Sequence, residues 1–170
     1  MQWHDHSVIP IRPFDHGDLS AIVAFSLRAW APIFESLRAV LGDPIFLRLH
    51  PDWKVGQADA VTSACTSEHL EVYVATVDAR AVGFVAIALD AYHERMGAIE
   101  ILAVDPDHQR TGIGRALTEY ALSVMTGKGM TIAVVETGGD PGHAPARSTY
   151  EAAGFTLLPI ARYFHLLSAT

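Results

Sequence analysis

The stretch "DPDHQRTGIGRALTEY", residues 105–120, determines how the rest of the chain can fold. It places Gly112 and Gly114 directly after an apolar run and directly before an amphipathic pattern. A strand, a tight glycine turn and a helix start in this order leave unpaired backbone N–H groups at the positive end of the helix dipole. Glycine lets an anion come close to the backbone and accepts a positive φ. The stretch therefore indicates either a phosphate-binding turn or an ordinary strand-to-helix connection.

Two familiar phosphate-binding motifs do not match this glycine turn. The dinucleotide fingerprint G-x-G-x-x-G requires a third small residue, whereas this chain has Leu117 at that position. The nucleoside triphosphate loop ends in G-K-[ST], whereas Gly127, Lys128 and Gly129 follow a helical pattern instead of preceding one. A phosphate ligand held at this turn would therefore belong to another class.

The composition predicts one globular domain over residues 1–170. The chain is 50% hydrophobic and 18% charged, whereas disordered chains are poor in apolar residues. A net charge of −7 argues against nucleic acids and anionic membranes as partners, and it mildly favours a cationic small substrate.

We expect a cytoplasmic protein with no membrane contact. The first ten residues lack the apolar segment of a secretory signal, and the longest apolar run, residues 81–89, is shorter than the ~20 residues that cross a bilayer. The single cysteine, Cys65, cannot form an internal disulfide, which suits a reducing compartment. The nine histidines are scattered, so no metal site is expected.

Hydrophobic periodicity predicts a mixed α/β fold in which helical and β-rich segments are interleaved. The second β-rich run, residues 81–89, is apolar on both faces and is expected inside a covered sheet. Helices are expected over residues 15–30, 32–42, 53–65, 113–127 and 144–153. Strands are expected over residues 7–14, 70–77, 81–89, 97–104, 130–137, 155–158 and 160–167, the last two joined around Pro159.

Two motifs together resemble the GNAT superfamily of coenzyme A-dependent acyltransferases. The first is the loop [QR]-x-x-G-x-[GA] within "ILAVDPDHQRTGIGRAL", formed by Gln109, Gly112 and Gly114. The second lies within "ARSTYEAAGF", where a late helix carries Ala146, Tyr150, Glu151, Gly154 and Phe155. The resemblance covers residues 99–155. It implies a GNAT-like mixed, mostly antiparallel central sheet that is flanked by helices and splayed at the cofactor cleft.

The resemblance also implies where acetyl-CoA is held. The backbone of Leu102, Ala103 and Val104 would pair with the pantetheine arm as though the arm were an added strand. His143 stands where the family usually has an asparagine that contacts the cofactor, and an imidazole could donate the same hydrogen bond. The pyrophosphate would lie against the loop that begins at Gln109, on the amides of Arg110, Thr111, Gly112, Ile113, Gly114 and Arg115.

Transfer of an acyl group to an amine needs a neutral amine, a stabilised oxyanion and a proton for the leaving thiolate. A backbone N–H within residues 102–104 is implied as the oxyanion donor, and Tyr150 as the proton donor; the alternative for Tyr150 is core packing. Glu100 interrupts an apolar strand, so it either faces the cleft as a base or forms a structural ion pair. Glu136 and Asp140 are reserve bases, although Asp140 also suits a turn.

The acceptor pocket is expected between the helical segment over residues 30–68 and the closing strands around residues 162–163. Phe34 and Glu35, with Glu136 at the facing strand, are the substrate candidates. Trp30, Trp53 and Tyr92 could complete an aromatic and acidic wall, although each of these side chains also fits ordinary core or surface packing.

We therefore expect a metal-independent N-acetyltransferase that moves acetyl from acetyl-CoA to a primary amine of a small molecule or peptide, by direct attack in a ternary complex. The alternative is a coenzyme A-binding sensor or scaffold without turnover. A third interpretation is an interaction module whose glycine turn is purely structural. Dimers are common in the family, so a homodimer is compatible with the resemblance.

Overall fold

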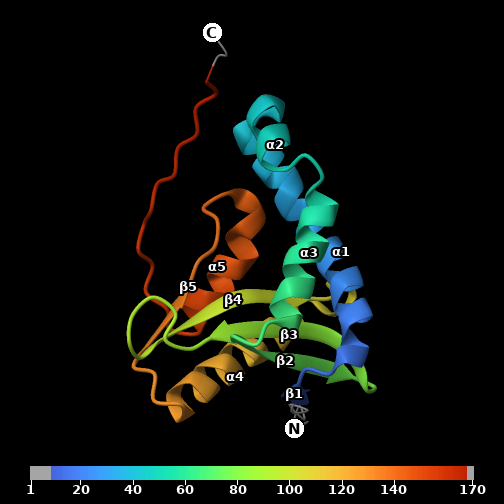
Figure 1. Cartoon of the computed structure of the whole chain (residues 1–170), viewed down its shortest axis with the longest axis vertical. Coiled ribbons are helices and arrows are strands. Elements are labelled where there is room, and N and C mark those ends of the chain that lie inside the picture. Colours follow the sequence, from blue (N-terminus) through green and yellow to red (C-terminus); the bar gives the residue numbers. More distant parts are fainter. Residues whose placement is uncertain (1–8, 168–170) are drawn as a thin grey trace, which may run out of the picture.

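The computed structural model describes residues 9–167, which form a five-stranded sheet with helices on both faces (Figure 1). The strands follow one another in the order β1-β2-β3-β4-β5; every neighbouring pair is antiparallel except β4 and β5, which are parallel. The strands are β1 (Ile11–Pro13), β2 (Leu70–Val77), β3 (Arg80–Ala88), β4 (Met96–Val104) and β5 (Ile132–Val135). The helices are α1 (Leu19–Leu41), α2 (Asp43–Leu49), α3 (Trp53–Thr66), α4 (Ile113–Gly127) and α5 (Ala144–Ala152).

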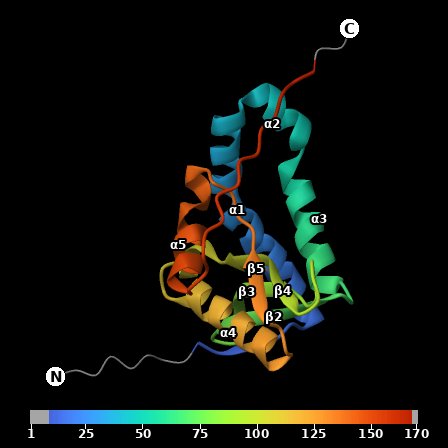
Figure 2. The same cartoon turned by 90° about the vertical axis from the view of Figure 1, so that its left-hand side faces the viewer.

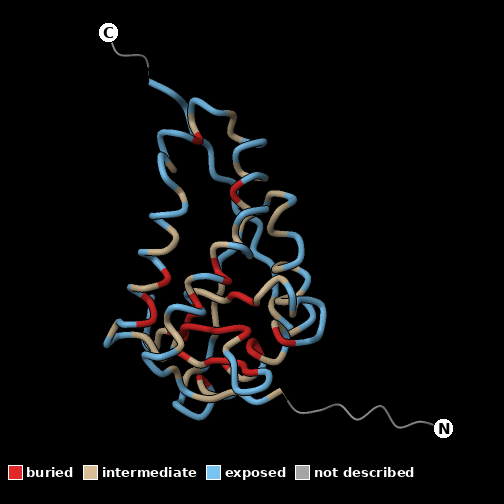
Figure 3. The backbone as a smooth tube through the Cα atoms, turned by 90° about the vertical axis from the view of Figure 1, so that its right-hand side faces the viewer, coloured by how far each residue is buried: buried red, intermediate tan, exposed pale blue. Residues whose placement is uncertain are grey.

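The sheet separates two hydrophobic clusters, as the apolar pattern of β3 predicts. Phe84 and Ala86 of β3 belong to the cluster beneath α1 and α3, whereas Val85 and Ile87 belong to the cluster beneath α4. Buried residues gather around the sheet, and the far ends of α1 and α3 are mostly exposed or half-buried (Figure 3). The core of the molecule therefore lies at the sheet, and the helices α1 to α3 extend from it as an arm.

The two parallel strands part at the middle of β4. Their register runs from Met96 opposite Ile132 to Ile99 opposite Val135, and β4 then continues to Val104 with no partner strand on that side among residues 9–167. On its other side β4 stays paired with β3 up to Val104. The predicted splay of the sheet is thus confirmed.

Two sequence predictions in the first third of the chain need correction. In place of the two predicted helices separated near Pro32, one long helix, α1 (Leu19–Leu41), follows a short 3₁₀ turn (His16–Asp18). Pro32 lies inside α1, where Ile22, Phe25 and Phe34 are buried on either side of it, so packing holds the helix across the proline. The first strand is shorter than predicted, Ile11–Pro13, and residues 7 and 8 lie outside the described residues.

The two predicted closing strands are also wrong. Residues 155–167 have no regular secondary structure; after α5 they run as an extended chain to the level of α2 (Figures 1 and 2). Residues 162–163 are exposed and line neither cavity described below, so they do not form the predicted wall of the acceptor pocket. The β-rich composition correctly indicated an extended backbone, but a strand also needs a hydrogen-bonded neighbour.

Two further features bear on function. Within residues 9–167, no helix has both the length and the apolar character needed to cross a bilayer.

Cys65 is buried in the cluster beneath α3, and this burial raises the pKa of its thiol to about 11.

Candidate active site

The glycine turn has the geometry expected for anion binding. Gly112 is left-handed, with φ 91°, and Arg110 shares this conformation with φ 61°. No side chain of the described residues caps the start of α4, so the N–H groups of its first turn have no side-chain acceptor there. A Cβ placed on Gly112 would have no protein atom within 4 Å, and one on Gly114 would meet Val104 at 3.8 Å. The turn therefore presents bare backbone at the positive end of α4.

Side-chain hydrogen bonds fix the turn to the end of β4. The Thr111 hydroxyl donates to the carbonyl of His108 at 2.6 Å, and Gln109 Nε2 donates to the carbonyl of Val104 at 3.2 Å. The guanidinium of Arg115 pairs with Glu119 one helical turn away, Nε to Oε1 2.7 Å. In this conformation the Arg115 guanidinium is engaged by Glu119, and the glycine turn leaves its backbone exposed.

The unpaired side of β4 leads from this turn to a small opening. Leu102, Ala103 and Val104 pair with β3 on one side, and the ladder to β5 has ended before them. An added extended chain could therefore hydrogen-bond to this side of β4. Where β4 and β5 part, a cavity of about 180 Å³ is lined by Tyr92, Ala98, Ile99, Glu100, Val134, Val135 and Glu136.

The opening brings together two glutamates that the sequence separates. Glu100 comes from β4 and Glu136 directly follows β5; both are exposed. Among residues 9–167 neither takes part in an ion pair. Of the two alternatives for Glu100, a carboxylate facing the cleft fits this geometry better than a structural ion pair.

Tyr150 lies half-buried on α5, and its ring meets that of Phe155 edge-on at 5.9 Å between centroids. Burial raises the pKa of Tyr150 to about 12. The phenol therefore keeps its proton at neutral pH and can donate it. Packing and proton donation are compatible for this side chain.

A buried carboxylate organises the loop between β5 and α5. Asp140 Oδ2 accepts hydrogen bonds from the Ser36 hydroxyl (2.6 Å) and the Gly142 amide (3.0 Å), and Oδ1 contacts Nδ1 of His143. The Asp140 side chain is only 5% exposed. Burial opposes its charge, but the hydrogen bonds from Ser36 and His143 outweigh this, so its pKa lies below the usual value. Its oxygens are occupied, which suits the expected turn role better than that of a base.

The glycines of the "GGDPGH" loop allow this close arrangement. A Cβ on Gly142 would lie 2.7 Å from Cβ of Ser36, and one on Gly138 would lie closer still to Asp140 and His143. The contact with Ser36, which the sequence did not signal because the serine lies within a helical pattern, fastens the loop to α1. The loop that carries His143 is thus held between the end of β5 and the helical arm.

Removing the buried carboxylate is expected to loosen this loop. Asp140→Ala should lower the free energy of unfolding by about 1–3 kcal/mol, because the half-buried Ser36 hydroxyl loses its acceptor and the Gly142 amide keeps only the Ser36 oxygen of its two acceptors. Since folding lowers the pKa of Asp140, its contribution is present above the unfolded pKa of ~3.9 and is lost as pH falls through the folded value.

Urea denaturation of Asp140→Ala and wild type at a series of pH values measures this difference. It should shrink as the solution is acidified below about pH 4. Asp59→Ala, which changes an exposed carboxylate on α3, is the matched control and should show no comparable loss. A difference between wild type and Asp140→Ala that is independent of pH would contradict the assigned role.

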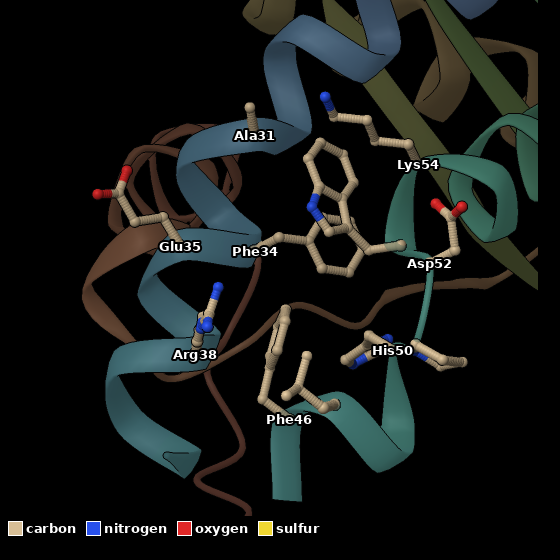
Figure 4. Close-up of a pocket in the computed structure, with 11 residues that line it drawn as sticks. Ala31, Phe34, Glu35, Arg38, Phe46, His50, Asp52 and Lys54 are labelled. Atoms are coloured by element: carbon tan, nitrogen blue, oxygen red, sulfur yellow. The ribbon is translucent and has the colours of Figure 1, made fainter. Parts of the chain in front are cut away.

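The larger cavity lies on the helical arm. It has a volume of about 370 Å³ and is lined by residues from α1, α2 and α3 (Figure 4). Phe34 and Trp53 stack in it, with centroids 4.6 Å apart and planes at 21°, and Phe46 and His50 complete an aromatic cluster. The carboxylate of Glu35 points away from these rings (Figure 4).

The structure thus brings together part of the predicted acceptor wall. Phe34, Glu35 and Trp53 line the larger cavity, whereas Tyr92 lies at the opening between the strands. Trp30 packs against the cluster beneath α1 and α3. The two cavities share no lining residue. No group of three metal-ligating side chains occurs within the part of the chain that the structure describes.

The family follows from these features and from a direct match. A family model described as an acetyltransferase (GNAT) domain matches residues 68–157, more than half of the chain. The chain belongs to this family. The match contains β2, β3, the splayed pair β4 and β5, the glycine turn and α5. The predicted membership of the GNAT superfamily is therefore confirmed.

Curated relatives match a shorter segment. A mycothiol acetyltransferase of Beutenbergia cavernae is 43% identical over 65 residues, which are 38% of this chain and 20% of that protein. The ribosomal protein bS18-alanine N-acetyltransferase of Escherichia coli is 36% identical over 64 residues, which are 38% of this chain and 42% of that protein. The matches thus span less than half the length of these curated relatives.

Solved structures share the fold over most of the chain. The ribosomal-protein-S18-alanine N-acetyltransferase of Escherichia coli superimposes with a TM-score of 0.64 at 21% identity, covering 88% of this chain and 79% of that chain. The aminoglycoside N-acetyltransferase AAC(6')-Iy in complex with coenzyme A gives a TM-score of 0.61 at 16% identity, covering 97% and 99% of the two chains. At these identities the likeness confirms the predicted fold.

Proposed function

We propose that this GNAT protein is a metal-independent N-acetyltransferase that moves acetyl from acetyl-CoA to a primary amine. One observation supports this most strongly: the left-handed Gly112 before the uncapped start of α4 is continuous with the unpaired side of β4, which leads to an opening flanked by two carboxylates. A long phosphorylated cofactor needs a site for its phosphates, a site for its extended arm and proton-transfer groups at its thioester. The backbone amides, the open strand edge and the carboxylates supply these in that order.

The residues that would hold acetyl-CoA are those that the resemblance implies. The amides of residues 110–115 bind the pyrophosphate, and the free side of Leu102, Ala103 and Val104 pairs with the pantetheine arm. One of the β4 amides faces the thioester carbonyl and stabilises the negative charge that develops on its oxygen. Acetyl-CoA supplies the activated acyl group, and the chain supplies position and proton transfer.

Two side chains carry the protons. Glu100 takes a proton from the acceptor ammonium, directly or through water, while Glu136 faces the amine from the other side of the opening. The neutral amine attacks the acyl carbon, the carbon–sulfur bond breaks, and Tyr150 gives its phenolic proton to the departing thiolate. When the amide forms, the nitrogen releases a second proton. This proton passes through the same carboxylates and water and reprotonates Tyr150.

His143 contacts the cofactor arm through its outer nitrogen. The ionised carboxylate of Asp140 accepts from Nδ1, which places the proton of a neutral imidazole on that nitrogen. Nε2 then accepts a hydrogen bond, whereas the asparagine of the family can also donate one. We therefore expect His143 to receive an amide N–H of the pantetheine arm.

The acceptor is a small molecule or a peptide that carries a primary amine. Phe34 and Glu35 on α1 stand on the arm next to Ser36, which is bonded to the loop after β5, so the arm and the cleft are held at a fixed distance. The named relatives modify a ribosomal protein alanine or aminoglycosides, which are chemically very different amines. We place the reaction in the cytoplasm and propose a homodimer.

Two measurements test the proposed activity. Acetyl-CoA should raise the melting temperature, because a ligand that binds only the folded state stabilises it. Free thiol should then appear when amines, polyamines, amino acids, aminoglycosides and peptides are supplied. Stabilisation without thiol release by any amine would favour the sensor or scaffold alternative, and no stabilisation would leave the glycine turn as a structural connection.

The base is tested by removing its charge. Glu100→Gln should lower kcat/KM at neutral pH by about 10-fold, less than the ~10²–10⁴-fold typical of acid–base catalysis, because Glu136 lines the same opening. The loss should diminish at high pH, where more of the amine is already neutral. Glu94→Gln, an exposed change in the loop before β4, is the control. A loss that does not vary with pH would remove Glu100 from proton transfer.

A further inference from the structure

The larger cavity on the helical arm is separate from the opening between β4 and β5. The two share no lining residue, and the glutamates assigned to proton transfer line only the opening. The volume of the larger cavity, about 370 Å³, lies within the ~300–1,000 Å³ of small-molecule sites. An aromatic cluster that only joined three helices would pack without such a space. The cavity therefore indicates a site for a ligand group other than the reacting amine.

The charges that lie over the aromatic rings of this cavity are positive. Nζ of Lys54 is 5.8 Å from the ring centroid of Trp53, and Lys54 forms no ion pair within residues 9–167. Cζ of Arg38 is 5.9 Å from the ring centroid of Phe46. Nε and Nη2 of Arg38 donate to Asp43, at 2.6 and 2.9 Å, which leaves Nη1 available to a ligand. Both cations line the cavity.

The two carboxylates that also line the cavity do not offset these cations at the rings. Glu35 points away from the rings (Figure 4), and Oδ1 of Asp52 accepts from the Val55 amide at 3.2 Å, at the start of α3. An ammonium group would meet ring faces where Lys54 and Arg38 already lie, and these like charges would repel it. A carboxylate would pair with both cations, and an aromatic group beside it would contact the rings.

The distance from the cavity to the cleft suits a short extended molecule. Phe25 of α1 lies over the sheet, with its ring centroid 6.2 Å from that of Phe84, and Phe84 pairs with Ala103 of β4. Phe34 lies nine residues further along the same helix, which at 1.5 Å per residue is about 13 Å. A peptide of about four extended residues, at ~3.3 Å each, spans this distance.

We propose that the acceptor is a short free peptide that ends in an aromatic residue. Its C-terminal carboxylate pairs with Lys54 and Arg38, its last side chain enters the larger cavity, and its N-terminal amine reaches the opening between Glu100 and Glu136. The inference rests on the proposed N-acetyl transfer, because it names the acceptor of that reaction. Transfer forms the amide bond at the N-terminal nitrogen and breaks the carbon–sulfur bond. Of the two protons that the ammonium loses, one ends on the thiol of coenzyme A and one in water.

Synthetic peptides test the length, the carboxylate and the ring separately. In a series of alanine, a variable number of glycines and a final phenylalanine, kcat/KM should be highest at about four residues. Amidation of the C-terminus should lower kcat/KM by about 10- to 100-fold, because the charged partner of both cations is lost. A final alanine in place of phenylalanine should lower it by about 10-fold. Rates that depend on none of these three changes would overturn the proposal.

A charge reversal in the cavity tests the carboxylate contact. Lys54→Glu should lower kcat/KM for the free peptide by about 10-fold and leave the amidated peptide unchanged, whereas Lys54→Arg should retain most of the activity. Arg48→Glu makes the same kind of change at an exposed position of α2 outside the cavity, and it should affect neither peptide. Melting curves show that each variant is folded. An equal loss for both peptides in Lys54→Glu would overturn the assigned contact.

Binding of the N-acetylated peptide separates this inference from the transferase activity. This peptide has no amine and cannot react, so calorimetry measures its Kd whether or not any amine releases thiol. Wild type should bind it about 10-fold more tightly than Lys54→Glu. Thiol release from simple amines without binding of this peptide would overturn the inference and leave the proposed function standing. Binding that depends on Lys54, with no thiol release from any peptide, would support the site and contradict the transferase.

Discussion

Tyr150→Phe is expected to lower kcat by about 10²- to 10³-fold while the affinity for acetyl-CoA stays close to that of the wild type. The substitution removes the proposed proton donor and keeps the ring that packs against Phe155 at 5.9 Å. Because burial raises the pKa of Tyr150 to about 12, the wild-type phenol stays protonated throughout the neutral range. A thiol-release assay gives kcat, and the thermal shift with acetyl-CoA reports binding.

The control and the pH profile make the result for Tyr150 specific. Tyr163→Phe removes a hydroxyl from a side chain that is 89% exposed, and its kcat should be unchanged. Because the wild-type phenol stays protonated well above neutral pH, the loss in kcat should be the same at every pH up to about 10. Full activity of Tyr150→Phe would mean that the thiolate takes its proton from water.

Gly112→Val is expected to weaken acetyl-CoA binding by about 10²- to 10⁴-fold. A valine side chain would occupy the space above the turn and separate the pyrophosphate from the amides. Each hydrogen bond to a charged group contributes about 1.5–3 kcal/mol, so the loss of two such bonds corresponds to this range. Equilibrium binding of coenzyme A measures the change directly.

Gly129→Val separates steric blockade from backbone strain. Gly129 follows the other end of α4, has a similar left-handed φ of 84°, and also has no protein atom within 4 Å of an added Cβ. Both variants should lose about 1–2 kcal/mol of stability from the left-handed conformation, but only Gly112→Val should lose cofactor affinity. Equal affinity in the two variants would place the phosphates elsewhere.

Local sequence signals predicted the parts of the fold that depend on short-range structure. β2, β3 and β4 and the helices α3, α4 and α5 lie within a few residues of their predicted ranges, because alternation, helical periodicity and glycine stops act over one element. A proline usually interrupts a helix, but the packing on both sides of Pro32 keeps α1 continuous. Whether residues 155–167 join the sheet depends on a partner strand, which no local pattern specifies.

The candidate site was predictable where a residue type is unusual for its position. A glutamate in an apolar strand and two glycines before a helix both stand out, so Glu100 and Gly112 could be selected from the sequence. The meeting of Glu100 with Glu136 could be expected only from the family's splayed strands, since it depends on where their pairing ends. Ser36 could not be found, because its contact with Asp140 joins residues that are 104 positions apart.

The buried thiol beneath α3 simplifies the kinetic measurements. With a pKa of about 11 and almost no exposure, Cys65 carries very little thiolate at the pH of an ordinary assay. Chromogenic disulfide reagents should therefore leave the native enzyme unlabelled, and the colour they develop would report released coenzyme A alone. The same inertness means that a fluorescent maleimide would mark only a cysteine introduced on the surface.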